Sequence, residues 1–192
     1  MRLFYLSHPQ VRIDPAVPVP DWGLSDVGAA RARQAAQSAW TFGVSRIVCS
    51  AERKAIEIAE IIAVARGLAV EIRERTHEND RSATGFLPPP EFEKVADLFF
   101  ANPETSIRGW ERAIDAQTRI VGEVEAVMHD GASGDILFVG HGGVGTLLQC
   151  HVAASPIARI RDQPGGGGNV FAFSWSPLAL IHGWRSIEQM EN

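Results

Sequence analysis

Two histidines stand where short apolar runs end. The run 3–6 leads into His8, and the run 136–139 leads into His141. An unbroken apolar run of this length is typical of a strand buried on both faces of a parallel sheet. Because Pro9 has no N–H to donate to a neighbouring strand, the first strand should end beside His8. Open α/β sheets bind ligands at the carboxyl ends of their strands, so both histidines are candidate site residues, the alternative being packed structural histidines.

A third apolar run adds a cation to the same edge. The strand predicted over 44–49 ends at Ser50, and Arg53 follows in the first turn of the next helix. Since parallel strands carry their carboxyl ends on one edge, Arg53 and the two histidines can converge there. Helices that begin near Ala51 and Gly142 would direct unpaired N–H groups at the same place. This combination indicates an anion-binding site.

The elements that position these residues alternate along the whole chain. We predict strands over residues 3–8, 44–49, 68–72, 136–139, 169–175 and 178–184. We predict helices over residues 25–40, 51–67, 91–101, 107–129 and 144–153. This order predicts a three-layer α/β/α sandwich with a mostly parallel central sheet and a C-terminal hairpin. No repeat or linker interrupts it, so residues 1–192 are expected to form a single domain.

The composition of the chain argues against several classes of binding partner. The chain has 192 residues, a net charge of −5 and no basic stripe, so we expect no nucleic-acid partner. No window approaches the ~18 apolar residues of a membrane span, and the first apolar run is too short for a signal segment. Cys49 and Cys150 suit a reducing compartment, so we expect a cytoplasmic protein without a membrane partner. No metal-ligand spacing is present, so we expect no metal and no cofactor. The oligomeric state is left open.

Five motifs, in chain order, resemble those of the histidine phosphatase superfamily, also called the phosphoglycerate mutase-like family. Leu6-Ser7-His8-Pro9-Gln10 stands at its Arg-His-Gly motif, and Leu24–Gly28 at its Leu-Thr-x-x-Gly helix start. Ser50–Ala59 resembles Ser-x-x-x-Arg-Ala-x-x-Thr-Ala, with Arg53 one residue early. Glu78 stands at the glutamate after the third strand, and Val139–Gly143 at Val-x-His-Gly-Gly. The resemblance covers essentially the whole chain and implies a phosphoglycerate mutase-like fold.

The resemblance also implies a two-step phosphoryl transfer. Neutral His8 would attack phosphorus and form a phosphohistidine. Arg53 and His141 would hold the phosphoryl oxygens as charge develops on them. Glu78 would protonate the leaving oxygen and then deprotonate water, without a metal. His77 and Asn79 are rival candidates for the position of Glu78.

Two departures from the family pattern concern phosphate binding. Ser7 stands where the family has an arginine, and Pro9 where it has a glycine. A lost charge-assisted hydrogen bond costs roughly 1.5–3 kcal/mol, so phosphate binding would weaken unless another guanidinium substitutes. Arg12 and Arg81 are candidates for that substitution. The predicted phosphate-binding residues are Ser7, Gln10, Arg12, Arg53, His141 and Gly142.

These motifs predict a metal-independent phosphomonoesterase with a phosphohistidine intermediate. Its substrate is expected to be a phosphorylated small molecule or a phosphoprotein. The segment after Glu78 is too short for the insertion that the mutases carry, so hydrolysis is favoured over mutase chemistry. The alternative is a degenerate, non-catalytic member that binds a phosphorylated ligand or protein, and Ser7 and Pro9 are the residues that favour it.

Overall fold

One mixed sheet forms the centre of the protein. The structure, a computed structural model, describes residues 1–131 and 133–190. Its sheet has six strands in the order β3-β2-β4-β1-β5-β6. They are β1 (Leu3–Ser7), β2 (Val44–Ser50), β3 (Val70–Arg73), β4 (Asp135–Gly140), β5 (Asn169–Ser174) and β6 (Ala179–Ser186). The pairs among β3, β2, β4 and β1 are parallel, and β5 and β6 form the antiparallel hairpin, as the sequence predicted. The antiparallel pairing of β5 with β1 joins this hairpin to the parallel strands.

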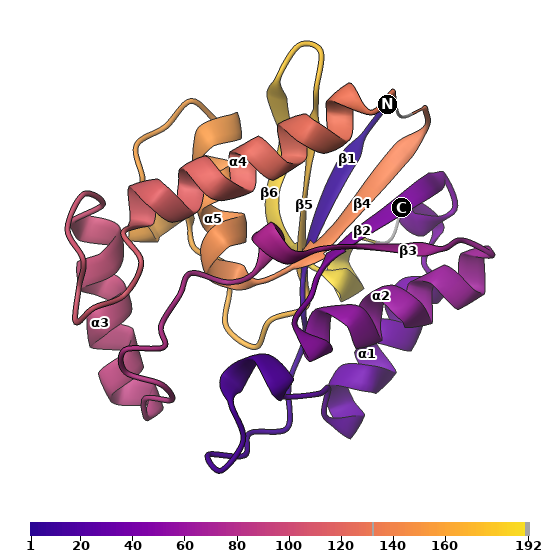
Figure 1. The fold of residues 1–192 in the computed structure, drawn as a ribbon. Coiled ribbons are helices and arrows are strands. Elements are labelled where there is room, and N and C mark those ends of the chain that lie inside the picture. The colour runs from indigo at the N-terminus through magenta and orange to yellow at the C-terminus, as the bar shows by residue number, and fades with distance from the viewer. Residues whose placement is uncertain (132, 191–192) are drawn as a thin grey trace.

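Helices cover both faces of this sheet (Figure 1). α1 (Asp26–Gln37) and α2 (Arg53–Arg66) lie on one face. α4 (Ala113–His129) and α5 (Gly142–Val152) lie on the other, and α3 (Pro89–Ala101) lies beside them and adds side chains to the same core (Figure 1). The arrangement is the predicted α/β/α sandwich. No helix within residues 1–131 and 133–190 combines the length and the apolar character needed to cross a bilayer.

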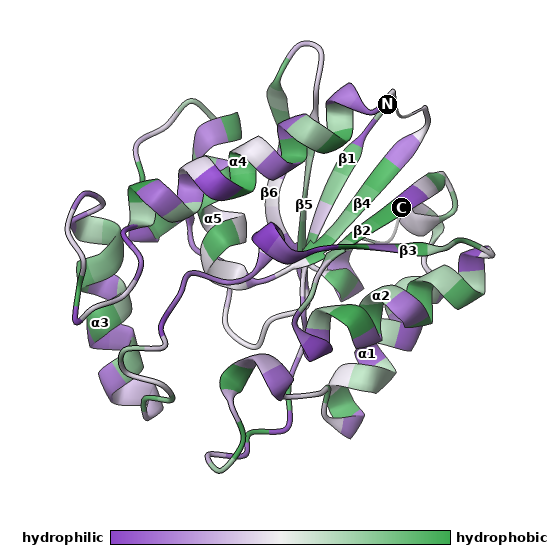
Figure 2. Cartoon of the chain, viewed as in Figure 1, coloured by the Kyte–Doolittle hydropathy of each residue, from purple (hydrophilic) through white to green (hydrophobic). Residues whose placement is uncertain are grey.

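The apolar run of β1 is explained by burial on both faces. Leu3 and Tyr5 belong to the core beneath α4 and α5, whereas Phe4 and Leu6 belong to the core beneath α1 and α2. Because successive side chains of a strand point to opposite faces, only a strand between two helical layers needs every residue to be apolar. Figure 2 shows the same hydrophobic character along the central strands.

The helix predicted over residues 107–129 begins later, at Ala113. Arg108 and Gly109 have φ angles of 53° and 82°, so the chain turns before the helix can start. Trp110, inside the range predicted for this helix, lies in the turn instead, where it is buried in the core and its Nε1–H donates to Thr84 Oγ1. The other predicted helices and strands are present, with ends shifted by a few residues.

Strand register brings the two histidine positions together. Ser7, the last residue of β1, is the register partner of Gly140, the last residue of β4. The N–H of His8 then donates to the carbonyl oxygen of Gly140 at 2.9 Å. His8 and His141 therefore leave the sheet side by side, at the edge where β2 also ends.

Candidate active site

His8 and His141 form the centre of the candidate site. Their ring centroids are 5.4 Å apart, with the ring planes at 70°. The side chain of His141 is completely buried. The sequence prediction that these two histidines converge is thus confirmed in geometry.

His8 is held in one tautomer. Its Nδ1 lies 2.9 Å from the carbonyl oxygen of Pro9. A carbonyl only accepts hydrogen bonds, so Nδ1 carries the proton and Nε2 keeps its lone pair. Burial, and next the adjacent His141, lower the pKa of His8 to about 3. At neutral pH His8 is therefore an uncharged imidazole with a free nucleophilic nitrogen.

The loop 164–168 holds the backbone of His8. The N–H of Gly168 donates to the His8 carbonyl oxygen at 3.0 Å. Gly167 has a φ of 63°, and a Cβ there would lie 2.4 Å from the same oxygen. Arg31 donates to the carbonyl oxygens of all three residues 166–168 and fixes the loop. The glycine run is thus explained by close approach to the strand that carries His8.

His141 contacts two groups from the end of β2. Its Nε2 lies 2.8 Å from Ser50 Oγ and 3.4 Å from the Glu52 carboxylate. Its Nδ1 is buried and has no hydrogen-bond partner among the described residues. Burial lowers the pKa of His141, while Glu52 and Glu78 act in the opposite direction. A buried ring nitrogen without a partner is available for a hydrogen bond to a ligand atom.

Glu78 is fixed at the start of α5. Its carboxylate accepts the N–H groups of Asn79, Gly143 and Val144 at 2.9–3.0 Å. Burial on its own raises the pKa of Glu78. The charges of Arg81 and His141 and the N–H groups outweigh that effect, so the pKa lies below its ordinary value. The helix N-terminus that was predicted to face the anion therefore binds this carboxylate.

The contacts of His77, Glu78 and Asn79 distinguish these three candidates for the general acid. Among them, only Glu78 accepts N–H groups from α5. The His77 ring lies 2.7 Å from the Glu78 carbonyl oxygen. Asn79 is 6% exposed, and its Nδ2 has no partner within the described ranges. Asn79 thus offers a second unpaired polar nitrogen in the site.

Lys54, and not Arg53, is the cation beside the histidines. Arg53 pairs with Glu57 at 2.7 Å, and its side chain is 65% exposed. Lys54 is 3% exposed, and its ammonium group contacts Glu52 and the carbonyl oxygen of Val19. The charge of Lys54 also contributes to the lowered pKa of His8. The structure does not bring the Arg53 side chain to the position predicted for it, and Lys54 lies there instead.

Glu52 is a further residue that the sequence analysis missed. Its carboxylate contacts Lys54, approaches His141 and accepts the N–H of Glu78 at 3.0 Å. Burial opposes ionisation of Glu52, but the charges of His141 and Lys54 prevail and lower its pKa to about 2. Glu52 therefore remains ionised and favours a protonated His141.

A side-chain network occupies the space beside Ser7. Its Oγ donates to Gln163 Oε1 at 2.5 Å and accepts the N–H of Asn169 at 3.1 Å. Asn169 also donates to Gln163 Oε1 at 3.0 Å. The amide nitrogen of Gln163 lies over Gly142, where a Cβ would approach it to 2.0 Å. Ser7 and Gly142 were predicted to bind phosphate, but both contact Gln163 here.

The remaining predicted anion ligands lie apart from the histidines. The Gln10 side chain accepts a hydrogen bond from Arg31 at 3.1 Å. Arg12 is exposed, and its backbone pairs with Gly23. Arg81 stacks over Phe92, 5.1 Å from the ring centroid, yet its charge is felt by Glu78. Of the two candidates for a substitute guanidinium, Arg81 is the one whose charge reaches the site.

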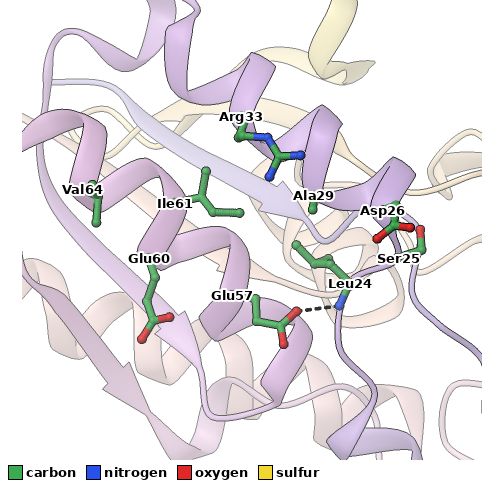
Figure 3. Close-up of a pocket in the computed structure, with 9 residues that line it drawn as sticks. All are labelled: Leu24, Ser25, Asp26, Ala29, Arg33, Glu57, Glu60, Ile61 and Val64. Atoms are coloured by element: carbon green, nitrogen blue, oxygen red, sulfur yellow. Dashed lines mark hydrogen bonds between the residues drawn. The ribbon is translucent and has the colours of Figure 1, made fainter.

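Two cavities are relevant to binding. One of about 890 Å³ begins at Glu52, Glu78 and Asn79 and extends to Trp22 and Phe86. The other, of about 540 Å³, is an open groove between α1 and α2 (Figure 3). None of the predicted site residues lines that groove, in which Glu57 accepts the N–H of Leu24. The larger cavity is therefore the substrate-binding candidate.

No group of three or more His, Cys, Asp or Glu residues in the described parts of the chain is arranged to hold a metal ion.

Known structures share this fold. A mycobacterial glucosyl-3-phosphoglycerate phosphatase matches with a TM-score of 0.81 and 19% identity, over 96% of this chain and 98% of that one. YhfR from Bacillus stearothermophilus matches with a TM-score of 0.79 and 20% identity, over 95% of this chain and 94% of that one. The alpha-ribazole phosphatase from Shigella flexneri matches with 0.73 and 16%, over 97% of each chain.

Of the two sequence comparisons, one finds no match and the other identifies a family. Comparison with curated protein sequences gives no match. The family model of the histidine phosphatase superfamily (branch 1) matches residues 13–177, a range that begins after His8 and includes Lys54, Glu78 and His141. It supports the expectation, drawn from the motifs, of an enzyme of the phosphatase class. The chain belongs to the histidine phosphatase superfamily, branch 1.

Proposed function

We propose that the protein is a metal-independent phosphomonoesterase that acts through a phosphohistidine on His8. The observation that carries this proposal is the state of His8. Its Nδ1 is bound to the Pro9 carbonyl oxygen, and its lowered pKa leaves Nε2 uncharged. A neutral imidazole of fixed tautomer, beside a second buried imidazole, is the arrangement that nucleophilic attack on phosphorus requires.

The reaction proceeds in two displacements. His8 Nε2 forms a bond to phosphorus while the ester P–O bond breaks, and the leaving oxygen takes the electron pair and a proton from the protonated form of Glu78. That form is the minor one at neutral pH, because the pKa of Glu78 lies below its ordinary value. Water then attacks the phosphohistidine, Glu78 receives its proton, and the P–N bond breaks to release inorganic phosphate. The Pro9 carbonyl oxygen stabilises the positive imidazole ring of the intermediate, because it accepts the Nδ1–H throughout.

Three nitrogens replace the arginine pair of the family as phosphoryl ligands. Lys54 supplies the fixed positive charge. His141 donates from Nδ1 once it is protonated, and the Glu52 carboxylate near Nε2 stabilises that protonated form. Asn79 Nδ2 adds a neutral donor. The dianionic phosphoryl group raises the pKa of His141 as it binds, so substrate binding itself creates the second cation.

The relatives support the class of reaction but not a substrate. Two of the similar structures are phosphatases by name: one is a glucosyl-3-phosphoglycerate phosphatase and the other an alpha-ribazole phosphatase. At 19% and 16% identity this likeness concerns the fold alone. The substrate is a phosphorylated compound whose class must be read from the cavity of this chain.

A second candidate function is phosphoryl binding without turnover. The observation that favours it is the bond of Ser7 to Gln163, which leaves no guanidinium at the family's first arginine position. A protein of this kind would bind inorganic phosphate or a phosphoester and release it unchanged. The retained nucleophile state of His8 favours the enzyme.

The test is hydrolysis of 4-nitrophenyl phosphate from pH 5 to 8 with divalent metals chelated. We expect turnover to persist under chelation and a phosphoenzyme that is stable in alkali and labile in acid, as a phosphohistidine is. Binding of inorganic phosphate without turnover and without a phosphoenzyme would instead establish the binding protein.

Glu78→Gln should separate substrates by their leaving groups. For an alkyl phosphate, which needs a proton on its leaving oxygen, we expect kcat/KM to fall about 10²- to 10⁴-fold. For 4-nitrophenyl phosphate the loss should be much smaller, because nitrophenolate leaves without a proton.

The low pKa of Glu78 also predicts how the rate depends on pH. The protonated fraction falls as pH rises above that pKa, so alkyl phosphate hydrolysis by the wild type should decline with rising pH more steeply than in Glu78→Gln. Equal losses for both substrates would contradict this role of Glu78.

A further inference from the structure

The larger cavity borders the proposed phosphoryl site, although His8, Lys54 and His141 are not among the residues that line it. It shares Glu52, Glu78 and Asn79 with that site, and Asn79 contributes the buried Nδ2 that lacks a partner in the described chain. Its far wall is made by Trp22 and Phe86. Given the proposed function, this cavity is the space beside Glu78 into which the leaving group of a phosphomonoester can extend.

The far wall offers aromatic faces. The rings of Trp22 and Phe86 have centroids 5.6 Å apart and planes at 59°. The Trp22 Nε1–H is already used, because it donates to the carbonyl oxygens of Asp14 and Val17. Trp22 is 7% exposed and Phe86 is 37% exposed, so Phe86 supplies most of the aromatic surface that is open to a ligand. Such faces bind apolar groups, and they bind cations in preference to anions.

The cavity walls are strongly acidic. Five carboxylates line it, against one guanidinium; these are Asp21, Glu52, Glu74, Glu78 and Asp80 against Arg81.

Three of these carboxylates, Asp21, Glu74 and Asp80, lack an ion-pair partner in the described chain, and Asp80 accepts the N–H of Ser82 at 2.8 Å. Glu52 pairs with Lys54, and Glu78 with backbone N–H groups. Asp21 and Glu74 are exposed at the cavity and have no ion-pair partner among the described residues. The single guanidinium, Arg81, lies over the rings of Phe92 and Trp110. The entrance side of the cavity thus carries uncompensated negative charge.

We propose that the substrates are phosphate esters of small amino or ammonium alcohols, whose positive charge lies between the aromatic wall and Asp21 and Glu74. This inference rests on the proposed function and names its substrate class. A cationic leaving group is attracted by both the rings and the carboxylates. A leaving group that carries a carboxylate or a second phosphate is repelled by the same walls.

The experiment compares phosphocholine with 3,3-dimethylbutyl phosphate, which has the same shape without the charge. We expect kcat/KM for phosphocholine to be about tenfold higher or more, from the cation–π and Coulomb contributions together. The preference should shrink as salt is added, because the contributing carboxylates are exposed. The anionic probe 3-phosphoglycerate should be the poorest of the three substrates.

Matched variants locate the source of the preference. Asp21→Asn combined with Glu74→Gln should lower the phosphocholine to dimethylbutyl ratio by about three- to tenfold. Glu60→Gln removes a carboxylate that lines the other groove, and it should leave the ratio unchanged. Equal kcat/KM for the two esters in the wild type would overturn the inference while leaving the phosphatase intact.

The inference can also be tested if the protein does not turn over. In His8→Asn, titration calorimetry measures the dissociation constants of the same two esters without hydrolysis. We expect tighter binding of phosphocholine there as well, and equal constants would overturn the inference. Failure of the proposed function would show in a different measurement, the absence of 4-nitrophenyl phosphate turnover by the wild type.

Discussion

Replacement of His8 by asparagine should lower kcat/KM for 4-nitrophenyl phosphate by about 10⁴- to 10⁶-fold, the loss found when an enzyme loses its nucleophile. Asparagine is chosen because its Nδ2–H can still donate to the Pro9 carbonyl oxygen, as His8 Nδ1 does. The local backbone is then retained while the nucleophilic Nε2 is removed. Steady-state kinetics and the alkali-stable phosphoenzyme are measured together, and both should disappear.

His129→Asn is the matched control for this substitution. His129 lies exposed at the end of α4 and its Nδ1 contacts only the carbonyl oxygen of Glu125 among its polar neighbours in the described chain. We expect its kcat/KM to stay within about twofold of the wild type, as for surface substitutions generally. A phosphoenzyme that persists in His8→Asn would contradict the assignment and point to His141 as the nucleophile.

The placement of the histidines could be predicted because it depends on strand pattern alone. Each histidine follows an unbroken apolar run, and such runs indicate central parallel strands whose carboxyl ends share an edge. In the structure, Ser7 and Gly140 are register partners at the ends of their strands, so the histidines that follow them lie side by side. No knowledge of loops or of side-chain packing was needed.

Lys54, and not Arg53, stands four residues after Ser50, at the spacing of the motif's arginine, and helix geometry explains why that position faces the site. Ile58 lies on the core face of α2, and Lys54 is four residues before it, so both point the same way. Arg53 is four residues before Glu57 and forms an exposed ion pair with it. Adjacent residues on a helix differ by about 100° in direction, so a shift of one position moves a cation from the site to the surface.

Gln163 could not be predicted. It lies 156 residues after Ser7 in the chain and meets it only because its loop returns over the start of α5. No periodicity marks a loop residue, and a glutamine carries no charge that would single it out. The glycine run that follows has no periodicity either, although its close approach to His8 is what requires glycine.

Replacement of Lys54 by methionine should lower kcat/KM by about 10²- to 10³-fold, because it removes the buried positive charge that is paired with Glu52 in this site. Methionine keeps the length and the packing of the lysine stem. The inhibition constant of inorganic phosphate should rise in parallel, since the same charge binds the product. Lys54→Arg, which keeps a cation, should lose less.

Arg53→Met is the matched control, one residue away and outside the site. Its ion pair with Glu57 is exposed, so kcat/KM and phosphate inhibition should stay within about twofold of the wild type. A large loss in Arg53→Met with little change in Lys54→Met would restore the sequence prediction and reject the geometry-based one.

Loss of Lys54 also leaves Glu52 as a buried carboxylate without its partner, which can destabilise a fold by about 3–5 kcal/mol. The double variant Glu52→Gln with Lys54→Met removes both charges together and avoids that penalty. If its thermal midpoint stays near that of the wild type while phosphate affinity remains weak, the lost activity is due to the missing charge. Recovery of phosphate affinity in the double variant would mean instead that Lys54 only neutralises Glu52, and that His141 alone binds the phosphoryl group.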